Sequence, residues 1–193
     1  MGTREEILAA AARIMREQGY ARATTKEIAR AAGYSEAALY KHFHDKTEIF
    51  LGVLDGQLPA LGGVLAELAA NTGKGTVRAN LVKVAETALH FYEESFPIAA
   101  SLFATRELLT AHRDGVRARG AGPRHPQLGL SRYLRAEQRL GRLPRTADPD
   151  AMSALLLGAC FQQAFLGHFD VDENTDHAVL ARSLVKALLH GLH

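Results

Sequence analysis

The segment GYSEAALYKHFHDK, at residues 33–46, gathers hydrogen-bond donors around a short apolar stripe. Leu39 and Phe43 lie four residues apart, so on a helix both side chains point the same way, toward a core. The phenol of Tyr40 and the ammonium of Lys41 then lie outside that stripe, beside further histidine and lysine donors. Cationic and hydroxyl side chains of this kind contact DNA phosphates, so the segment suits a nucleic-acid surface.

A helix that lies in the major groove places its first residues on base edges. The residues so placed here are Ser35, Glu36, Ala37 and Ala38, and alanine is small enough to approach a thymine methyl. We expect phosphate contacts from Tyr40, Lys41, His42 and Lys46, and from Thr24 and Thr25 at the start of the preceding helix. Two questions stay open: Thr24 could be only a helix cap, and Glu36 either accepts from a cytosine amine or points away.

Two short helices joined by a tight turn would position these side chains. Thr24 and Glu27 form a T-x-x-E capping box for a helix that ends near residue 32. Gly33 supplies the backbone freedom of the turn, and Ser35 caps the next helix. A first helix over residues 3–18, with a box at Thr3 and Glu6 and a stop at Gly19, precedes the pair. The layout is that of a helix-turn-helix.

The remaining sequence predicts an all-α chain, because no sustained period-2 alternation appears. Asp45 and Glu48 form a box for a fourth helix, which we expect to break near Pro59 and to resume until about residue 70. Helical periodicity then predicts helices over 76–94, 97–112, 127–141, 149–168 and 175–191, with Pro97, Pro126 and Pro149 near helix starts. Residues 114–126 are the least regular stretch.

Composition limits the class of protein. Net charge is only +2 over 193 residues, but residues 1–46 hold eight Lys/Arg against six Asp/Glu, so the whole excess lies there. Cys160 is the single cysteine and lies in an apolar helix, which fits a reducing compartment and an inert thiol. We expect a cytoplasmic protein without signal peptide or membrane span. None of the motifs G-x-S-x-G, H-E-x-x-H, the P-loop or a G-x-G-x-x-G after a strand is present, so we predict no enzyme and no cofactor. His42 and His44 are two residues apart and do not face each other on a helix, so we predict no metal site.

The stretch TTKEIARAAGYSEAALYKHFHDKTEIF, residues 24–50, resembles the signature of the TetR family of bacterial transcriptional repressors, and the resemblance extends over about residues 4–54. Tyr34 and Glu36 depart from the usual pattern. The resemblance implies a DNA-binding domain at residues 1–46 and a ligand-binding and dimerisation domain at 47–193. It further implies a homodimer on a palindromic operator, released when a small-molecule effector moves the fourth helix. An activator, or a DNA-binding protein without a ligand, stays an alternative.

The second half supports that layout from its own residues. The helix over 149–168 is apolar nearly all round, which indicates burial, either in its own bundle or against a partner chain. We favour dimer contacts from Leu155, Gly158, Gln162, Phe165, Leu180 and Leu184. An apolar or aromatic effector would contact His90, Phe91, Phe96, Phe103, Tyr133, Met152 and Cys160. Residues 106–145 hold ten arginines against three acids, either a solvated face or an attraction for an anionic ligand such as an acyl-CoA phosphate.

Overall fold

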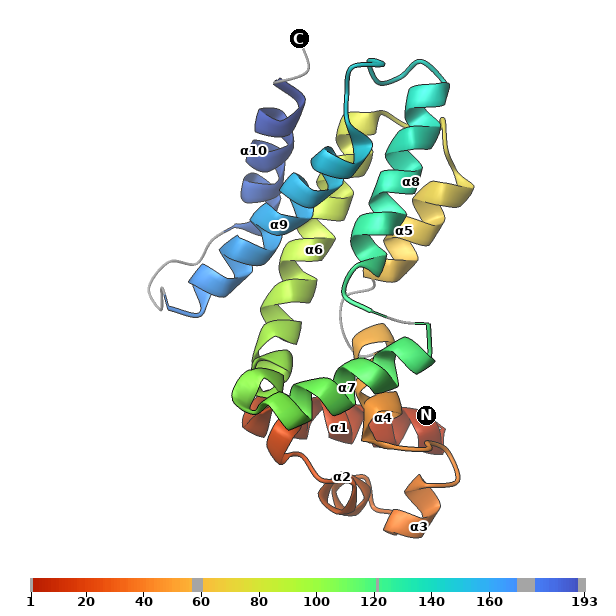
Figure 1. Ribbon diagram of the computed structural model, residues 1–193, viewed down its shortest axis with the longest axis vertical. Helices are drawn as coiled ribbons and strands as arrows, with labels where there is room; N and C mark the ends of the chain where they lie inside the picture. The colour runs from red at the N-terminus through yellow and green to blue at the C-terminus, as the bar shows by residue number, and fades with distance from the viewer. Residues whose placement is uncertain (1, 57–60, 121, 170–175, 191–193) are drawn as a thin grey trace. The chain divides into compact units, whose positions relative to one another are not determined.

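The computed structural model describes residues 2–56, 61–120, 122–169 and 176–190, and the regular structure in these ranges is helical (Figure 1). The elements in chain order are α1 (Thr3–Arg22), α2 (Thr25–Ala31), α3 (Glu36–Leu39), α4 (Lys46–Gly56), α5 (Leu61–Ala70), α6 (Val77–Ala100), the 3-10 helix η1 (Ser101–Ala104), α7 (Arg106–Ala118), α8 (His125–Arg139), α9 (Pro149–Gly167) and α10 (His177–His190). The predicted all-α fold is confirmed.

The chain divides into two compact units. The first, Met1–Leu58 with Glu94–Gly122, holds α1 to α4, the end of α6, η1 and α7. The second, Pro59–Glu93 with Pro123–His193, holds α5, most of α6, and α8 to α10. We call them the head unit and the bundle unit. The head unit therefore takes in a later segment of the chain that the proposed boundary at residue 46 does not include.

The core of the head unit forms where α1 packs on α2 and α4. Ile7, Met15 and Ile28 are fully buried there, and so are Leu39 and Phe43, as their spacing predicts. Gly19 interrupts α1 with φ +76°, and a Cβ at this position would lie 2.8 Å from Ser101 Oγ. Gly19 therefore kinks α1, and its lack of a side chain lets Ser101 of η1 approach closely.

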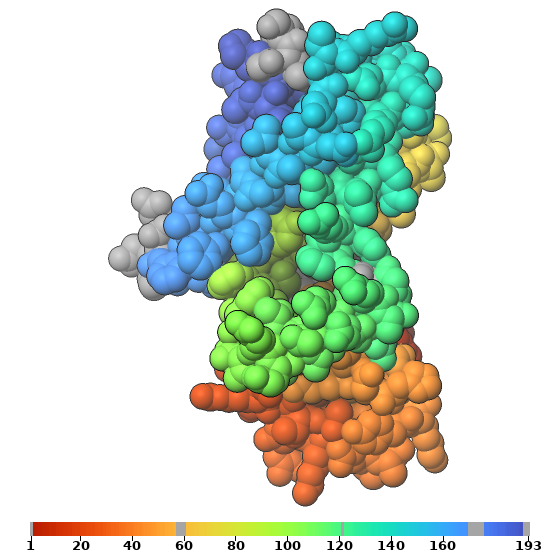
Figure 2. Space-filling model, in the orientation of Figure 1, coloured from red at the N-terminus to blue at the C-terminus, as the bar shows by residue number. Residues whose placement is uncertain are grey.

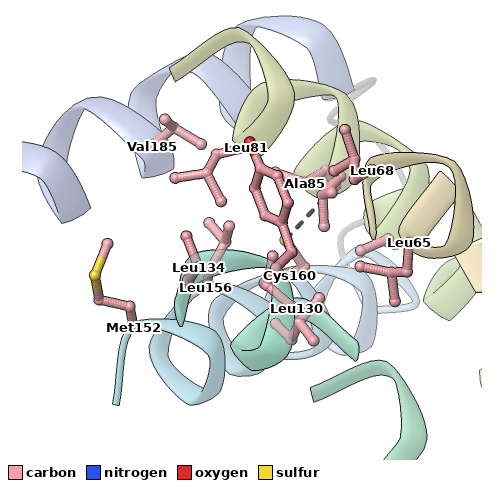
Figure 3. Packing of buried hydrophobic residues seen from close by; sticks show 14 of the residues in the cluster. Leu65, Leu68, Leu81, Ala85, Leu130, Leu134, Met152, Leu156, Cys160 and Val185 are labelled. Carbon is pink, nitrogen blue, oxygen red and sulfur yellow. Dashed lines mark hydrogen bonds between the residues drawn. The ribbon is translucent and has the colours of Figure 1, made fainter. Parts of the chain in front are cut away.

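The core of the bundle unit is an apolar cluster shared by α5, α6, α8, α9 and α10 (Figure 3). Leu65 and Leu68 enter it from α5, and Leu130 and Leu134 from α8. Cys160 lies among them on α9, and its thiol donates to the carbonyl oxygen of Ala85, with 3.6 Å between Sγ and O. Burial raises the pKa of this thiol to about 12, so it is an unreactive core side chain.

Several predicted helix boundaries are wrong. Pro97 lies inside α6 rather than at a helix start, three residues before that helix ends. The cap of α1 is Gly2, whose N–H donates to the Glu5 carboxylate, so the predicted box at Thr3 and Glu6 does not form. Residues 114–118, predicted to be irregular, continue α7, which begins at a Thr105 cap that the sequence analysis missed. The predicted break at Pro59 falls outside the described residues.

The other predicted caps are confirmed. Thr24 and Glu27 form the box that opens α2, and Asp45 accepts the N–H of Glu48 at the start of α4. Pro149 stands in the first turn of α9, and Pro126 in that of α8. Among the described residues no single helix is long and apolar enough to cross a membrane, although α4 and α5 taken together meet the criteria of length and composition.

Candidate nucleic-acid interface

The turn between α2 and α3 has the geometry that its sequence predicts. Gly33 has φ +82°, a left-handed conformation that only glycine adopts without strain. Ser35 caps α3 by accepting the N–H of Ala38 at 3.2 Å. The helix itself is short, four residues, but the Phe43 N–H still donates to the Leu39 carbonyl, so the helical path continues one turn further. Leu39 and Phe43 are thereby fixed in the core, and their neighbours are left at the surface.

A polar cluster ties the start of α2 to α3. The Thr25 hydroxyl donates to the Glu36 carboxylate at 2.6 Å and lies 3.3 Å from the Tyr40 hydroxyl. Glu36 is thus half-buried and directed toward α2. Of the two alternatives left open for Glu36, this orientation favours a carboxylate that points away from the bases over one that accepts from a cytosine amine. The cluster sets the orientation of the Tyr40 phenol, which remains half-exposed at the surface of the head unit. None of these contacts tests the predicted contacts with DNA.

The start of α2 is already occupied by its own cap. Thr24 Oγ1 accepts the N–H of Glu27, and the Glu27 carboxylate accepts both from the Thr24 N–H and from its hydroxyl. These hydrogen bonds lower the pKa of Glu27. Thr24 therefore acts as a helix cap, and its phosphate contact stays a prediction.

Exposed basic side chains lie close to this cluster in the sequence. Lys41, His42 and His44 are exposed just after α3, and Ala37 is exposed within it. Two further exposed cations, Lys26 and Arg30, lie on α2, and the sequence analysis did not select them. The net positive charge of residues 1–46 was the signal that could have found them.

Lys46 differs from the other predicted DNA contacts, because its ammonium has partners within the head unit. The ammonium donates to the Ala21 carbonyl at 3.3 Å and lies 4.3 Å from the centre of the Tyr20 ring. Burial lowers its pKa. A phosphate contact by Lys46 stays a prediction, and in this conformation the side chain instead fastens the start of α4 to the end of α1.

The second part of the head unit braces α4. Arg119, at the end of α7, pairs with Asp45 at 2.8 Å, and Gly115 lies so close to Thr47 that a Cβ would stand 3.2 Å from it. His112 on α7 packs edge-on against Tyr20 and Phe50, with ring centres 5.1 and 4.7 Å apart. Burial, and next the nearby Lys46 charge, lower the pKa of His112, so this imidazole is neutral near pH 7. α4, the helix that follows α3 in the chain, is therefore held by α7 as well as by α1.

The tyrosine in the turn also has a defined role. The Tyr34 hydroxyl donates to the Glu6 carboxylate of α1, which anchors the turn to the first helix. Arg4 lies over the Phe43 ring, 5.0 Å from its centre. The departure at Tyr34 from the usual family pattern thus adds a contact rather than disturbing the turn.

The predicted effector contacts divide between the two units. Tyr133, Met152 and Cys160 are buried in the bundle core, where Asn80 donates to the Tyr133 hydroxyl at 2.8 Å. Phe91 packs against the same core, and its ring lies 5.5 Å from that of Tyr92. His90 is exposed on α6. The two other candidates, Phe96 and the exposed Phe103, belong to the head unit. The structure therefore brings four of the seven together in or against one core, and the ligand contacts themselves stay predictions.

The predicted dimer contacts of α9 lie at the surface of the bundle unit. Leu155 is 65% exposed and Phe165 37%, and Gly158 and Gln162 are exposed between them. Leu180 and Leu184 on α10 are half-buried. Four further apolar residues are exposed on the same side and were not among the predicted dimer contacts: Ala154, Phe161 and Leu166 on α9, and Phe169 just after its end. We use the name α9 face for the exposed residues on this side of α9 and just after it (α9 is mid-blue in Figure 2), namely Ala154, Leu155, Gly158, Phe161, Gln162, Phe165, Leu166 and Phe169.

Apart from Gln162, the α9 face is apolar, and it carries no charge. No charged residue occurs between Ala151 and Gly167, and in Figure 2 α9 lies at the visible surface of the bundle unit. Large exposed apolar patches mark protein–protein interfaces, membrane contacts or ligand grooves. In the single chain this face is not covered by the bundle, and its burial against a partner chain stays a prediction.

Known proteins resemble this chain in two ways. Residues 7–53 match the family described as bacterial regulatory proteins, tetR family. Over 53 residues the chain is 45% identical to the nucleoid occlusion factor SlmA of Vibrio campbellii, a match that covers 27% of each chain.

Solved structures resemble the whole fold. A putative TetR-family transcriptional regulator from Mesorhizobium loti has a TM-score of 0.72 at 20% identity, covering 98% of this chain and 96% of its own. The transcriptional regulator FadR from Bacillus subtilis, solved with stearoyl-CoA, has a TM-score of 0.69 at 17% identity, covering 98% and 99%.

Proposed function

We propose that this chain is a DNA-binding repressor of the TetR family of bacterial transcriptional regulators, whose homodimer binds a palindromic operator and leaves it when a small effector binds. The family match over residues 7–53 and the fold shared with a solved TetR-family regulator support this proposal. The observation that carries the proposal is the helix-turn-helix surface of the head unit. Its fixed turn at Gly33, its capped α3 and its exposed Tyr40 and Lys41 together suit a major groove and its flanking phosphates.

The DNA contacts divide by chemistry. Ser35, Ala37 and Ala38 are small and lie at or near the start of α3, so the backbone can approach base edges closely. Tyr40, Lys41 and His42 follow on the exposed side, where they would hold phosphates and fix the register without reading sequence. Glu36 is held by Thr25, so its carboxylate would not need to face the phosphates. Lys46 would join the phosphate contacts only by leaving the Ala21 carbonyl.

Dimerisation is supported by the α9 face. An uncharged apolar surface that runs along a whole helix suits a twofold interface, in which the same residues of both chains meet. Gly158 lets the helices approach closely, and the α10 residues Leu180 and Leu184 lie partly exposed on the helix that packs on α9. Two heads carried by one dimer would read half-sites about one helical turn apart, or a multiple of it.

Effector control is supported by how α4 is held. Within the head unit α4 packs on α1 and α7. Asp45, which joins the end of the α3 segment to α4, pairs with Arg119 after α7. A shift of α4 would therefore disturb the element that carries the DNA contacts. An effector that prefers one conformation changes DNA affinity by the ratio of its own two affinities. The structurally similar FadR from Bacillus subtilis was solved with stearoyl-CoA. The first effector screen should therefore include acyl-CoA thioesters as well as aromatic compounds.

The test has two steps on the full-length protein. Bound sites are first selected from random duplex DNA, and we expect a sequence with twofold symmetry whose affinity falls steeply with salt. Long-chain acyl-CoA thioesters, free fatty acids and aromatic cations are then screened for release of the selected duplex. Enrichment of no sequence would contradict operator binding, and release by no compound would favour a ligand-independent regulator. Activation or repression follows from where the selected site lies relative to a promoter.

The similarity to a nucleoid occlusion factor supports no second function. It covers 53 residues, 27% of each chain, so DNA binding is all that we transfer from it. The cytoplasm, where the DNA is, is the location that this function requires.

A further inference from the structure

Two histidines and a glutamate from distant parts of the sequence meet on the surface of the bundle unit. His90 and Glu93 lie three residues apart on α6, so they share a face of that helix. His177, 87 residues further along the chain, begins α10 and packs its ring against His90 with 4.3 Å between ring centres. One ligand atom from each of the three residues lies within 4.8 Å of the others.

We propose that His90, Glu93 and His177 form a binding site for a divalent transition metal of the zinc class, which joins α10 to α6. The proposal concerns the bundle unit alone and does not rest on DNA binding. The two residues on α6 are a His-x-x-Glu pair, the reverse of the Glu-x-x-His pair with which helical bundles hold metals.

The spacing of the donors is close to what such a metal needs. The Nδ1 atoms of His90 and His177 are 3.1 Å apart, and His177 Nε2 lies 3.6 Å from the Glu93 carboxylate. Zn–N and Zn–O bonds of about 2.0–2.2 Å in a tetrahedron place neighbouring ligand atoms about 3.3 Å apart. A small rotation of the His177 ring would turn one nitrogen toward both partners.

The charge around the site favours a cation. Besides Glu93, the carboxylates of Glu86 and Asp176 lie close enough to His177 to act on it electrostatically. Glu86, His90 and Glu93 follow one another at i, i+4 and i+7 along one face of α6. Asp176 is engaged as the cap of α10, where it accepts the N–H groups of Ala178 and Val179, so Glu86 or a water is the candidate fourth ligand.

The donor set selects the class of metal. Two imidazoles and one carboxylate suit zinc, cobalt, nickel or copper, whereas calcium and magnesium take oxygen ligands. His90 and Glu93 are exposed, which gives a metal direct access from solvent, and the side chain of His177 is 16% exposed, which restricts its motion. Three protein ligands leave a position open for water or for an incoming group.

The test is titration of the tag-free full chain with Co²⁺, followed by visible absorption, and with Zn²⁺, followed by calorimetry. We expect one ion per chain and the intense visible bands of tetrahedral cobalt. His90→Ala, His177→Ala and Glu93→Gln should each weaken binding at least about tenfold, since even outer-shell partners of a metal contribute this much. The matched control is His125→Ala, an exposed histidine on α8, which should bind as the wild type does.

Glu93→Gln keeps the size and the helix propensity of the side chain, so the proposal stays testable if a histidine variant fails to fold. Zn²⁺ should raise the melting temperature of the wild type and of His125→Ala, but not that of Glu93→Gln. Failure of the wild type to bind one ion per chain overturns the proposal, and so does equal binding by wild type and Glu93→Gln. Neither result depends on DNA, so each leaves the proposed repressor function untouched.

Discussion

Leu155 and Leu156 are neighbours on α9 that should respond to truncation in opposite ways. Leu155 is 65% exposed on the α9 face, whereas Leu156 is 2% exposed in the bundle core. Leu155→Ala should therefore weaken the dimer and leave the folded chain intact. Leu156→Ala should weaken the fold and leave the association of folded chains nearly unchanged.

The expected size of the Leu155 effect follows from its exposure. Full burial of a leucine is worth about 1.5–3 kcal/mol, so burying its exposed 65% in a dimer contributes about 1–2 kcal/mol per chain. A twofold interface contains the residue twice, which gives about 2–4 kcal/mol for the dimer. At about 1.4 kcal/mol per tenfold, Leu155→Ala should raise the dimer Kd about 30- to 700-fold. Leu156→Ala should instead cost about 2–5 kcal/mol of unfolding free energy, because it leaves a cavity.

The assay is sedimentation equilibrium of both variants well below their melting temperatures, with urea unfolding monitored in parallel. A dimer Kd that is unchanged in Leu155→Ala would refute the assignment of the α9 face to the dimer. A similar rise of the dimer Kd in both variants would show that truncation acts through the fold and not through the surface.

Four changes in the head unit have distinct expected effects. Leu39→Ala should cost about 2–5 kcal/mol of unfolding free energy, seen in urea unfolding, because it removes a fully buried side chain. Lys41→Ala should reduce the slope of log affinity for DNA against log salt by about 1. Lys46→Ala should chiefly lower the melting temperature, because its ammonium bonds the Ala21 carbonyl, and an equal salt slope in both lysine variants would contradict this division. Partial burial raises the pKa of Asp45, but hydrogen bonds from backbone N–H groups of α4 and the charge of Arg119 outweigh it, and the pKa is lowered. This stabilisation is present above the ordinary carboxyl pKa of about 4 and is lost below it, so acid should destabilise Asp45→Asn less steeply than the wild type.

Local rules predicted the helix-turn-helix well. The caps at Thr24, Ser35 and Asp45, the turn at Gly33 and the buried pair that begins at Leu39 each depend on residues close in sequence. Cap and turn patterns of this kind can be recognised from neighbouring residues in the sequence, without knowledge of the tertiary structure.

Contacts between distant residues account for what the sequence did not reveal. Pro97 was expected to start a helix, because a proline removes one helical hydrogen bond, but it lies so near the end of α6 that little of the helix remains to be broken. The hydrogen bonds from Thr25 to Glu36 and from Lys46 to the Ala21 carbonyl join residues 11 and 25 positions apart. The sequence could not predict them, because they depend on how the helices of the head unit pack. The meeting of His90 with His177 likewise depends on the packing of α10 in the bundle unit.

A hydroxyl-radical footprint of the protein on a selected duplex tests most directly whether two heads bind one operator. The account predicts two protected segments centred about 34–36 Å apart along the DNA, or a multiple of that distance, with twofold symmetry between them. A single protected segment at low salt, or none, would contradict it.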